Sequence, residues 1–276
     1  MESKKVSVII PTLNRINLLK RALTSVINQT HKNLEILVID DSPDKEINKK
    51  NKDMIEDLTD NRIKFILNEN KHGGAGARNH GLKLATGELI AFLDDDDIWK
   101  EEKIRLQVEK LLANPNVGII YCDYELFDND ENKITDIKNR TKGKVYLKLL
   151  KSFCISETST ALIKKEVLNK IGLFDENLRA NHEYDLYIRI SEFYEFDYVD
   201  KILVKKYHYN ERISADFTRK VKGLKLFYKK HKYRYYKLPL SFRLKNTLKY
   251  YILLIIFSLG RLIGDRVYSI IPKRFK

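Results

Sequence analysis

The sequence predicts an α/β fold: a Rossmann-like, mainly parallel sheet flanked by helices, followed by a basic helical C-terminal extension. Short apolar runs alternate with segments of helical spacing through the first half of the chain, as in repeated strand–helix units. The chain has 276 residues, of which 43% are hydrophobic and 33% charged, a globular composition. Residues 201–276 hold 21 Lys and Arg against 3 Asp and Glu, so the net charge of +14 is concentrated there.

Strands and helices are expected in alternation along the first half. Apolar runs predict strands at 6–10, 34–39, 63–67, 89–93 and 117–122. Helical spacing or composition predicts helices near 18–27, 45–58, 77–85 and 101–113, and the glycine-rich residues 73–76 are expected to break the chain before the third helix. Repeated units of this length favour a sheet covered on both faces.

After residue 125 the alternation loosens. We expect a loop or hairpin over 125–143, a strand at 158–163, a helix at 165–171 that ends at Gly172, a helix at 183–192 and a strand at 196–204. Two basic, tyrosine-rich helices are expected at 216–237 and 241–264, because Pro239 interrupts the pattern between them.

Four consecutive aspartates, residues 94–97, directly follow the apolar run at 89–93. The carboxyl end of a central strand is where open α/β sheets bind ligands. Carboxylate oxygens suit Mg²⁺ or Mn²⁺, which in turn bridge to phosphate oxygens. The alternative is a solvated acidic loop, or capping by Asp97 of a helix that starts near Lys100.

Three further motifs stand at predicted strand ends. Pro11 and Thr12 end the first strand, Asp40 and Asp41 end the second, and Arg78 lies in the glycine-rich segment 72–81. Each has an ordinary alternative: a plain β–α turn, helix capping by Asp41 or Ser42, and a flexible turn that matches neither the P-loop nor the dinucleotide-binding pattern.

Taken together, the motifs resemble a family 2 glycosyltransferase with the GT-A fold, over about residues 5–205. In order they read Val-Ser-Val-Ile-Ile-Pro-Thr-Leu-Asn, Val-Ile-Asp-Asp-Ser-Pro-Asp, Gly-Gly-Ala-Gly-Ala-Arg-Asn-His-Gly-Leu and Gly-Glu-Leu-Ile-Ala-Phe-Leu-Asp-Asp-Asp-Asp. The resemblance implies a glycosyltransferase domain at 1–210, with a nucleotide-sugar half (1–123) and an acceptor half (124–210). Residues 211–276 form the basic helical extension.

The resemblance also implies roles for individual residues. The donor-binding residues would be Pro11, Thr12, Asp41, Asn70, Arg78 and Asp95. Asp96 is the first choice as ligand of Mn²⁺ or Mg²⁺, with Asp94 beside it, and the run of four aspartates leaves the register open by one residue.

The catalytic base is implied in the second half of the chain, at His182-Glu183-Tyr184-Asp185-Leu186. Glu183 stands where the family has its base, and His182 replaces the usual acid before it, as a neighbour that could tune it. The alternative is that Glu183 and Asp185 merely cap a helix. Residues 156–160 resemble the strand on the acceptor side, where substrate hydroxyls could bond.

The implied activity is inverting transfer of a sugar from a nucleotide diphosphate sugar to a hydroxyl of a glycan or lipid-linked acceptor. UDP is the expected nucleotide, and cell-surface polysaccharide or glycoconjugate synthesis is the expected setting. The alternative is a non-catalytic scaffold that binds nucleotides or anions through its basic region. A phosphatase is disfavoured by Ile98 and Trp99 after the acidic run, and nucleic acid is not an expected partner, because no recognised module is present.

The basic extension suggests a surface role. Its apolar run at 250–260 is shorter than the ~20 residues that a membrane span needs, and basic and tyrosine residues flank it. We expect residues 241–268 to contact an anionic membrane, or else a core or a homo-oligomer. The two cysteines, Cys122 and Cys154, suggest no disulfide framework, and no apolar leader is evident. The expected location is cytoplasmic, peripheral on the inner face of the membrane.

Overall fold

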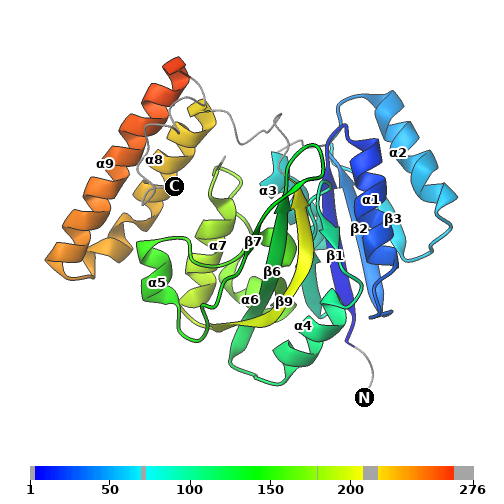
Figure 1. Ribbon diagram of the computed structural model, residues 1–276, viewed down its shortest axis with the longest axis horizontal. Helices are drawn as coiled ribbons and strands as arrows, with labels where there is room; N and C mark the ends of the chain where they lie inside the picture. Colours follow the sequence, from blue (N-terminus) through cyan, green and yellow to red (C-terminus); the bar gives the residue numbers. More distant parts are fainter. Residues whose placement is uncertain (1–3, 70–72, 179, 208–216, 264–276) are drawn as a thin grey trace. The chain divides into compact units, whose positions relative to one another are not determined.

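The computed structural model describes residues 4–69, 73–178, 180–207 and 217–263 (Figure 1). The chain forms two compact units. Unit 1 comprises residues 1–174 and 186–208, and unit 2 comprises residues 175–185 and 209–276. The domain boundaries expected from the sequence stay predictions.

Unit 1 is organised around a sheet whose nine described strands follow the order β3-β2-β1-β4-β8-β6-β9-β5, with β7 paired to β6. The first four strands along the chain are β1 (Val6–Thr12), β2 (Leu34–Asp40), β3 (Ile63–Leu67) and β4 (Leu89–Phe92). The others are β5 (Ile98–Trp99), β6 (Val117–Phe127), β7 (Lys133–Ile137), β8 (Leu162–Lys164) and β9 (Glu195–Tyr207). The strand at 63–67 has the predicted bounds, and most of the other predicted strands differ by a few residues.

The sheet is parallel in its first half and mixed in its second. β1 pairs in parallel with β2 and β4, β2 with β3, and β6 with β9. The pairs β4–β8, β6–β8, β6–β7 and β5–β9 are antiparallel. β7 follows β6 through a short turn, which only an antiparallel pair allows, because parallel neighbours need a crossover of a dozen residues or more.

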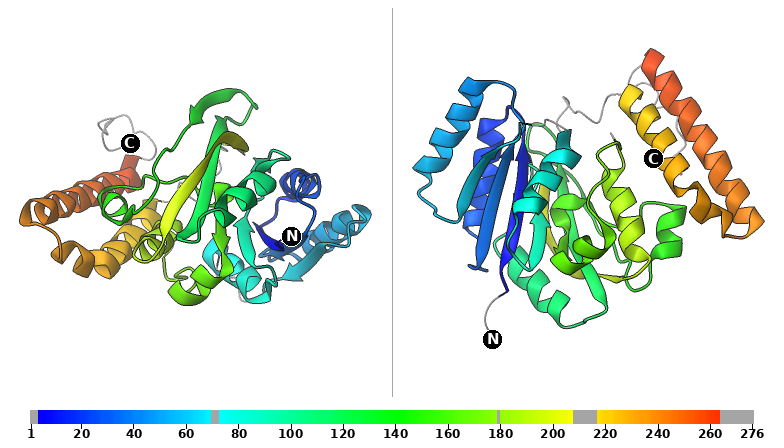
Figure 2. Two further views of the ribbon diagram at one scale, coloured as in Figure 1. Left: turned by 90° about the horizontal axis from the view of Figure 1, so that it is seen from below. Right: turned by 180° about the vertical axis from the view of Figure 1, so that it is seen from behind.

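Helices cover both faces of this sheet. They are α1 (Ile16–Ile27), α2 (Lys45–Asp57), α3 (Gly73–Leu84), α4 (Lys103–Leu112), α5 (Tyr146–Lys151), α6 (Lys165–Ile171) and α7 (His182–Ser191), whose first turn belongs to unit 2. α1 and α3 lie on opposite faces (Figures 1 and 2). Val8 joins the core under α1, whereas Ile9 faces α3, where a methyl group added at Gly81 would come within 2.5 Å of it. This alternation along one strand is what a sheet buried on both sides requires.

Some local predictions were wrong. Residues 73–76 form the first turn of α3 instead of breaking the chain before it, and Gly73 takes a left-handed φ of 72° there. The strand expected at 158–163 begins with the 3₁₀ turn Thr158–Thr160, so β8 is only three residues long. α2 is capped by Asp44, which accepts the amide of Glu46 at 2.8 Å, and not by Asp41 or Ser42.

The described residues of unit 2 include α8 (Phe217–Tyr236) and α9 (Leu240–Ile263), besides the first turn of α7. α8 and α9 form a hairpin in which the rings of Tyr228 and Tyr250 stack at 4.0 Å. At the other end, Gly260 contacts the ring of Phe217 so closely that a methyl group there would lie 2.3 Å from it. No described helix combines the length and the apolar character needed to cross a membrane.

Glu35 joins several segments at one end of the parallel strands. Its buried carboxylate accepts hydrogen bonds from the hydroxyl of Ser7 at 2.7 Å, the amide of Thr86 at 2.8 Å and the ammonium group of Lys64 at 2.9 Å. Burial alone would raise the pKa of Glu35, but these bonds outweigh it and lower the pKa to about 2.

Glu35→Gln should therefore lower the free energy of unfolding by about 2 kcal/mol at pH 7. A carboxyl group with a lowered folded pKa stabilises the fold above its unfolded value of 4.5 and loses this effect as the pH falls toward 2. Urea denaturation at several pH values should show the difference between variant and wild type shrinking below pH 4.5. The control Glu56→Gln alters an exposed i,i+4 pair with Lys52 and should change stability by less than about 0.5 kcal/mol. An equal loss at pH 7 and at the acid end would contradict the ionic account.

Candidate active site

The four aspartates lie at the edge of the sheet where β1, β2 and β4 end. Because these strands are parallel neighbours, their carboxyl ends meet there. The hydroxyl of Thr12 donates to Asp95 at 2.8 Å, and the amide of Asp41 donates to the carbonyl oxygen of Thr12 at 2.9 Å. Pro11 pairs in register with Ile39 directly before this contact. The structure thus brings together Pro11, Thr12, Asp41 and Asp95, as the sequence predicted.

Two arginines contact the first three aspartates of the run. Arg15 donates from Nη1 to Asp95 at 3.2 Å and to Asp96 at 2.9 Å. Arg78 donates from Nη2 to Asp94 at 2.5 Å. Arg78 was predicted here, whereas Arg15 was missed, although it directly follows the first motif, which ends at Asn14. Both guanidinium groups stay charged at any physiological pH, so they neutralise part of the carboxylate charge.

Lys206, from β9, holds the buried end of the run. Its ammonium group lies 2.7 Å from Asp97 and 3.0 Å from Glu157. Burial alone would lower the pKa of Lys206, but the neighbouring carboxylates hold it well above its usual value. Asp97 is 1% exposed and caps no helix, since α4 begins at Lys103. Sequence reasoning missed Lys206 because it follows Asp97 by 109 residues and no motif surrounds it.

The acidic cluster fits a divalent cation. Carboxylate oxygens of Asp94, Asp96 and Asp97 all lie within 4.8 Å of one another. Three cationic side chains, Arg15, Arg78 and Lys206, meet the four aspartates, and Lys206 also meets Glu157, so carboxyl groups outnumber cationic groups here. Burial, together with the charge of Asp96, raises the pKa of Asp95 to about 7, so the ionised form of this carboxyl group is disfavoured in the cluster as it stands. Hard oxygen ligands in such a group suit Mg²⁺ or Mn²⁺.

The two aspartates at the end of β2 have different surroundings. Asp40 is 1% exposed and accepts a hydrogen bond from Asn51 of α2 at 2.9 Å, which is a structural role. Asp41 accepts a bond from the amide group of Asn68 at 2.5 Å, and the Oδ1 atom of Asn68 lies 2.9 Å from Nδ1 of His80. Sequence reasoning missed Asn68 and His80, although His80 lies within the glycine-rich motif. Asn70 lies outside the described residues.

Ser159, in the segment 156–160, supports the aspartates from inside the protein. Its hydroxyl accepts the amide hydrogen of Asp94 at 3.1 Å, and its carbonyl oxygen accepts the indole N–H of Trp99 at 2.8 Å. Ser159 is fully buried, whereas the carboxylate of Glu157 is 51% exposed. Ser159 therefore fixes the turn after β4, and an acceptor-binding role of this segment stays a prediction.

Glu183 lies in the first turn of α7 and belongs to unit 2. Nε2 of His182 lies 3.2 Å from its carboxylate. Asp185 is fully buried and lies 3.0 Å from His231 and 2.9 Å from Lys230, both of α8. Burial lowers the pKa of His231, so this ring is neutral at pH 7 and Lys230 carries the positive charge that faces Asp185. These contacts fasten the turn that bears Glu183, whose catalytic role stays a prediction.

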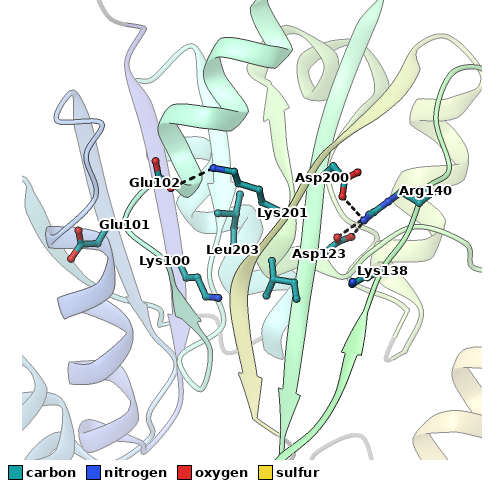
Figure 3. Close-up of a pocket in the computed structure, with 10 residues that line it drawn as sticks. Lys100, Glu101, Glu102, Asp123, Lys138, Arg140, Asp200, Lys201 and Leu203 are labelled. Carbon is teal, nitrogen blue, oxygen red and sulfur yellow. Dashed lines mark hydrogen bonds and ion pairs between the residues drawn. The ribbon is translucent and has the colours of Figure 1, made fainter.

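A pocket of about 530 Å³ lies apart from this site, and none of the four aspartates at 94–97 lines it. Figure 3 shows Arg140 between Asp123 and Asp200, and Lys201 paired with Glu102. Acidic and basic groups in this pocket thus neutralise one another, and their arrangement resembles neither a metal site nor a nucleotide site.

Comparison with known proteins gives the following matches. The sequence model described as Glycosyl transferase family 2 matches residues 7–172. UDP-Glc:alpha-D-GlcNAc-diphosphoundecaprenol beta-1,3-glucosyltransferase WfgD of Escherichia coli is 36% identical over 191 residues, covering 69% of this chain and 70% of that protein.

Two solved structures have a similar fold. The mannosyltransferase PcManGT of Pyrobaculum calidifontis, in complex with GDP-Man and Mn²⁺, has a TM-score of 0.63 at 20% identity and matches over 83% of this chain and 65% of that one. TarS residues 1–349 of S. aureus, in complex with UDP-GlcNAc, have a TM-score of 0.63 at 18% identity, over 80% of this chain and 65% of that one. The match spans about two thirds of each solved chain. At this identity the likeness concerns the fold, and it confirms the predicted GT-A class.

Replacing Lys206 should show how far the stability of the fold depends on its buried ammonium group. Lys206→Met leaves Asp97 buried beside Glu157 without its counter-charge, so the free energy of unfolding should fall by about 3 kcal/mol. Urea denaturation at pH 7 measures the loss. Lys205→Met, at the half-buried neighbouring position, is the matched control and should cost less than about 1 kcal/mol. In the double variant Lys206→Met/Asp97→Leu much of the loss should return, and a purely additive double variant would argue against the pair.

Proposed function

Because the chain belongs to glycosyltransferase family 2, we propose that it transfers a sugar from a nucleotide diphosphate sugar to an acceptor hydroxyl, with inversion at the anomeric carbon. The observation that carries this proposal is the cluster of four aspartates at the carboxyl ends of β1, β2 and β4, next to Thr12 and Arg78. An acidic run with too few counter-charges is suited to binding a cation together with a diphosphate.

The donor-side roles that we propose are those that the family resemblance implies. Asp41 accepts hydrogen bonds from a uracil-like base, with Pro11 and Thr12 lining the nucleoside pocket. Asp95 contacts the ribose or the sugar, and Arg78 lies beside the diphosphate. Asp96 and Asp94 hold Mn²⁺ or Mg²⁺, which when bound offsets the charge of the leaving diphosphate. UDP is the preferred nucleotide, because the Escherichia coli relative, which is 36% identical, is named for UDP-Glc.

Glu183 is the proposed general base. Its carboxylate takes the proton of the acceptor hydroxyl while the hydroxyl oxygen attacks the anomeric carbon from the side opposite the diphosphate. The bond between that carbon and the diphosphate oxygen breaks, and the nucleoside diphosphate leaves. No covalent bond to the enzyme forms, so the configuration at the anomeric carbon is inverted. His182, 3.2 Å away, is placed to stabilise the carboxylate charge of Glu183.

We further propose a lipid-linked glycan as the acceptor, in cell-surface polysaccharide or glycoconjugate synthesis on the inner face of the membrane. The support is the Escherichia coli relative, whose name gives a diphosphoundecaprenol-linked GlcNAc as its acceptor. A cytoplasmic setting agrees with both cysteines being free.

Calorimetric titration with UDP tests the donor site. Mn²⁺ should tighten UDP binding to the wild type, and Asp96→Ala should remove at least about tenfold of that gain, because a carboxylate ligand of the metal is lost. Asp53→Ala, an exposed acid on α2, is the control and should bind as the wild type does. Metal-independent binding in every variant would contradict the metal role. Absence of binding to UDP, dTDP and GDP would favour the non-catalytic scaffold.

Glu183→Gln tests the base. With a donor that binds, the rate of sugar transfer to a polyprenyl-diphosphate-linked GlcNAc should fall by about 10²- to 10⁴-fold, while the affinity for UDP stays unchanged. Glu192→Gln, an exposed position just past the end of α7, is the matched control. A Glu183→Gln variant that transfers at the wild-type rate would assign the proton to another group.

A further inference from the structure

One face of α9 is apolar and exposed along the length of the helix. Its large side chains are 44% to 64% exposed: Leu240, Leu244, Leu248, Tyr251, Ile255 and Leu259. Their spacing is four, four, three, four and four residues. At about 100° of rotation per residue, all six therefore fall within an arc of about 100°. We call these six side chains the apolar stripe.

The apolar stripe is not needed to hold the hairpin together. α9 packs on α8 through a different face, where Tyr250 stacks on Tyr228 at 4.0 Å and Gly260 meets the ring of Phe217. Thr247, on the same side, lies 3.0 Å from the hydroxyl of Tyr228. A regular apolar stripe of this length, exposed beside a helix face that is already packed, indicates an external apolar partner.

Positive charge surrounds the apolar stripe. On a helical projection Lys245 lies on one side of it and Arg261 lies on the other, and both residues are exposed. Residues 217–263, which span α8 and α9, hold 13 Lys and Arg and no Asp or Glu. A partner that covers the stripe must therefore bring apolar surface and negative charge together.

We propose that α9 lies flat on an anionic lipid bilayer, with the apolar stripe among the acyl chains near the headgroups and the flanking basic residues on the lipid phosphates. A bilayer surface supplies both chemistries at once. A second copy of the chain would bring the same basic helices to the contact, and like charges would oppose the pairing. At 24 residues α9 is about 36 Å long, which is enough for the whole stripe to lie in one plane. The binding does not depend on the proposed sugar transfer.

Flotation with vesicles tests the proposal on the full chain. Wild type should float with vesicles of phosphatidylcholine and phosphatidylglycerol, less with phosphatidylcholine alone, and less at high salt, because salt screens the lipid charge. Leu248→Gln/Ile255→Gln removes two apolar side chains from the stripe without changing charge, and should weaken binding about tenfold or more. Lys245→Gln/Arg261→Gln should weaken binding to the anionic vesicles about fivefold for each of the two charges removed.

Matched controls carry the same changes elsewhere. Leu67→Gln/Leu112→Gln alters exposed leucines of unit 1, and Lys49→Gln/Lys50→Gln alters exposed lysines of α2. Both should float like the wild type. Sedimentation velocity without lipid should show one monomeric species in every variant. Three results would overturn the proposal. The wild type does not float with anionic vesicles, or the Leu248→Gln/Ile255→Gln variant floats as the wild type does. The third is a wild type that sediments as a dimer while the Leu248→Gln/Ile255→Gln variant sediments as a monomer.

Discussion

The architecture of unit 1 is constrained by the repulsion among four adjacent carboxylates. Cationic side chains that meet the run reduce this repulsion. Arg15 follows β1, Arg78 comes from α3 and Lys206 from β9, so three distant parts of the chain must converge on the turn after β4. The parallel order of β2, β1 and β4 makes this convergence geometrically simple, because their carboxyl ends share one edge. The strand order that builds the sheet therefore also brings the three cationic side chains to the aspartates.

The compensation is incomplete in a way that suits the proposed binding of a cation. Full neutralisation by side chains would leave no electrostatic reason for a cation to enter, whereas no neutralisation would cost folding energy. Asp97 is buried and paired with Lys206, but Asp96 remains partly accessible beside Arg15. The buried end thus holds the turn in place, and the accessible end is where the proposed cation would bind.

Sequence patterns indicate local features well and long-range partners poorly. The parallel strands, the acidic run after β4 and the helix end at Gly172 follow from apolar runs and turn chemistry, which are short-range signals. Lys206 carries no such signal, since only the folded sheet brings β9 to Asp97. The glycine-rich residues 73–76 misled in a different way: glycine allows a break, but here the left-handed φ of Gly73, which glycine adopts readily, stands at the start of a helix. Asp40 and Asp41 look equivalent in the sequence, but the structure gives them different partners: Asn51 of α2 for Asp40 and Asn68 for Asp41.

Unit 2 links the two proposals physically. Asp185 fastens the first turn of α7 to His231 and Lys230 of α8, so Glu183 is anchored in the same compact unit that carries the apolar stripe of α9. A lipid-linked acceptor has its reactive hydroxyl at a short distance from a bilayer. If the unit that bears the proposed base also rests on that bilayer, the base and the acceptor hydroxyl both stay within a thin layer along the membrane. The effective concentration of the acceptor hydroxyl at the base is raised in this way, without any further contact to the acceptor. The basic helices would then contribute to catalysis through positioning, although no side chain of theirs would touch the reacting atoms.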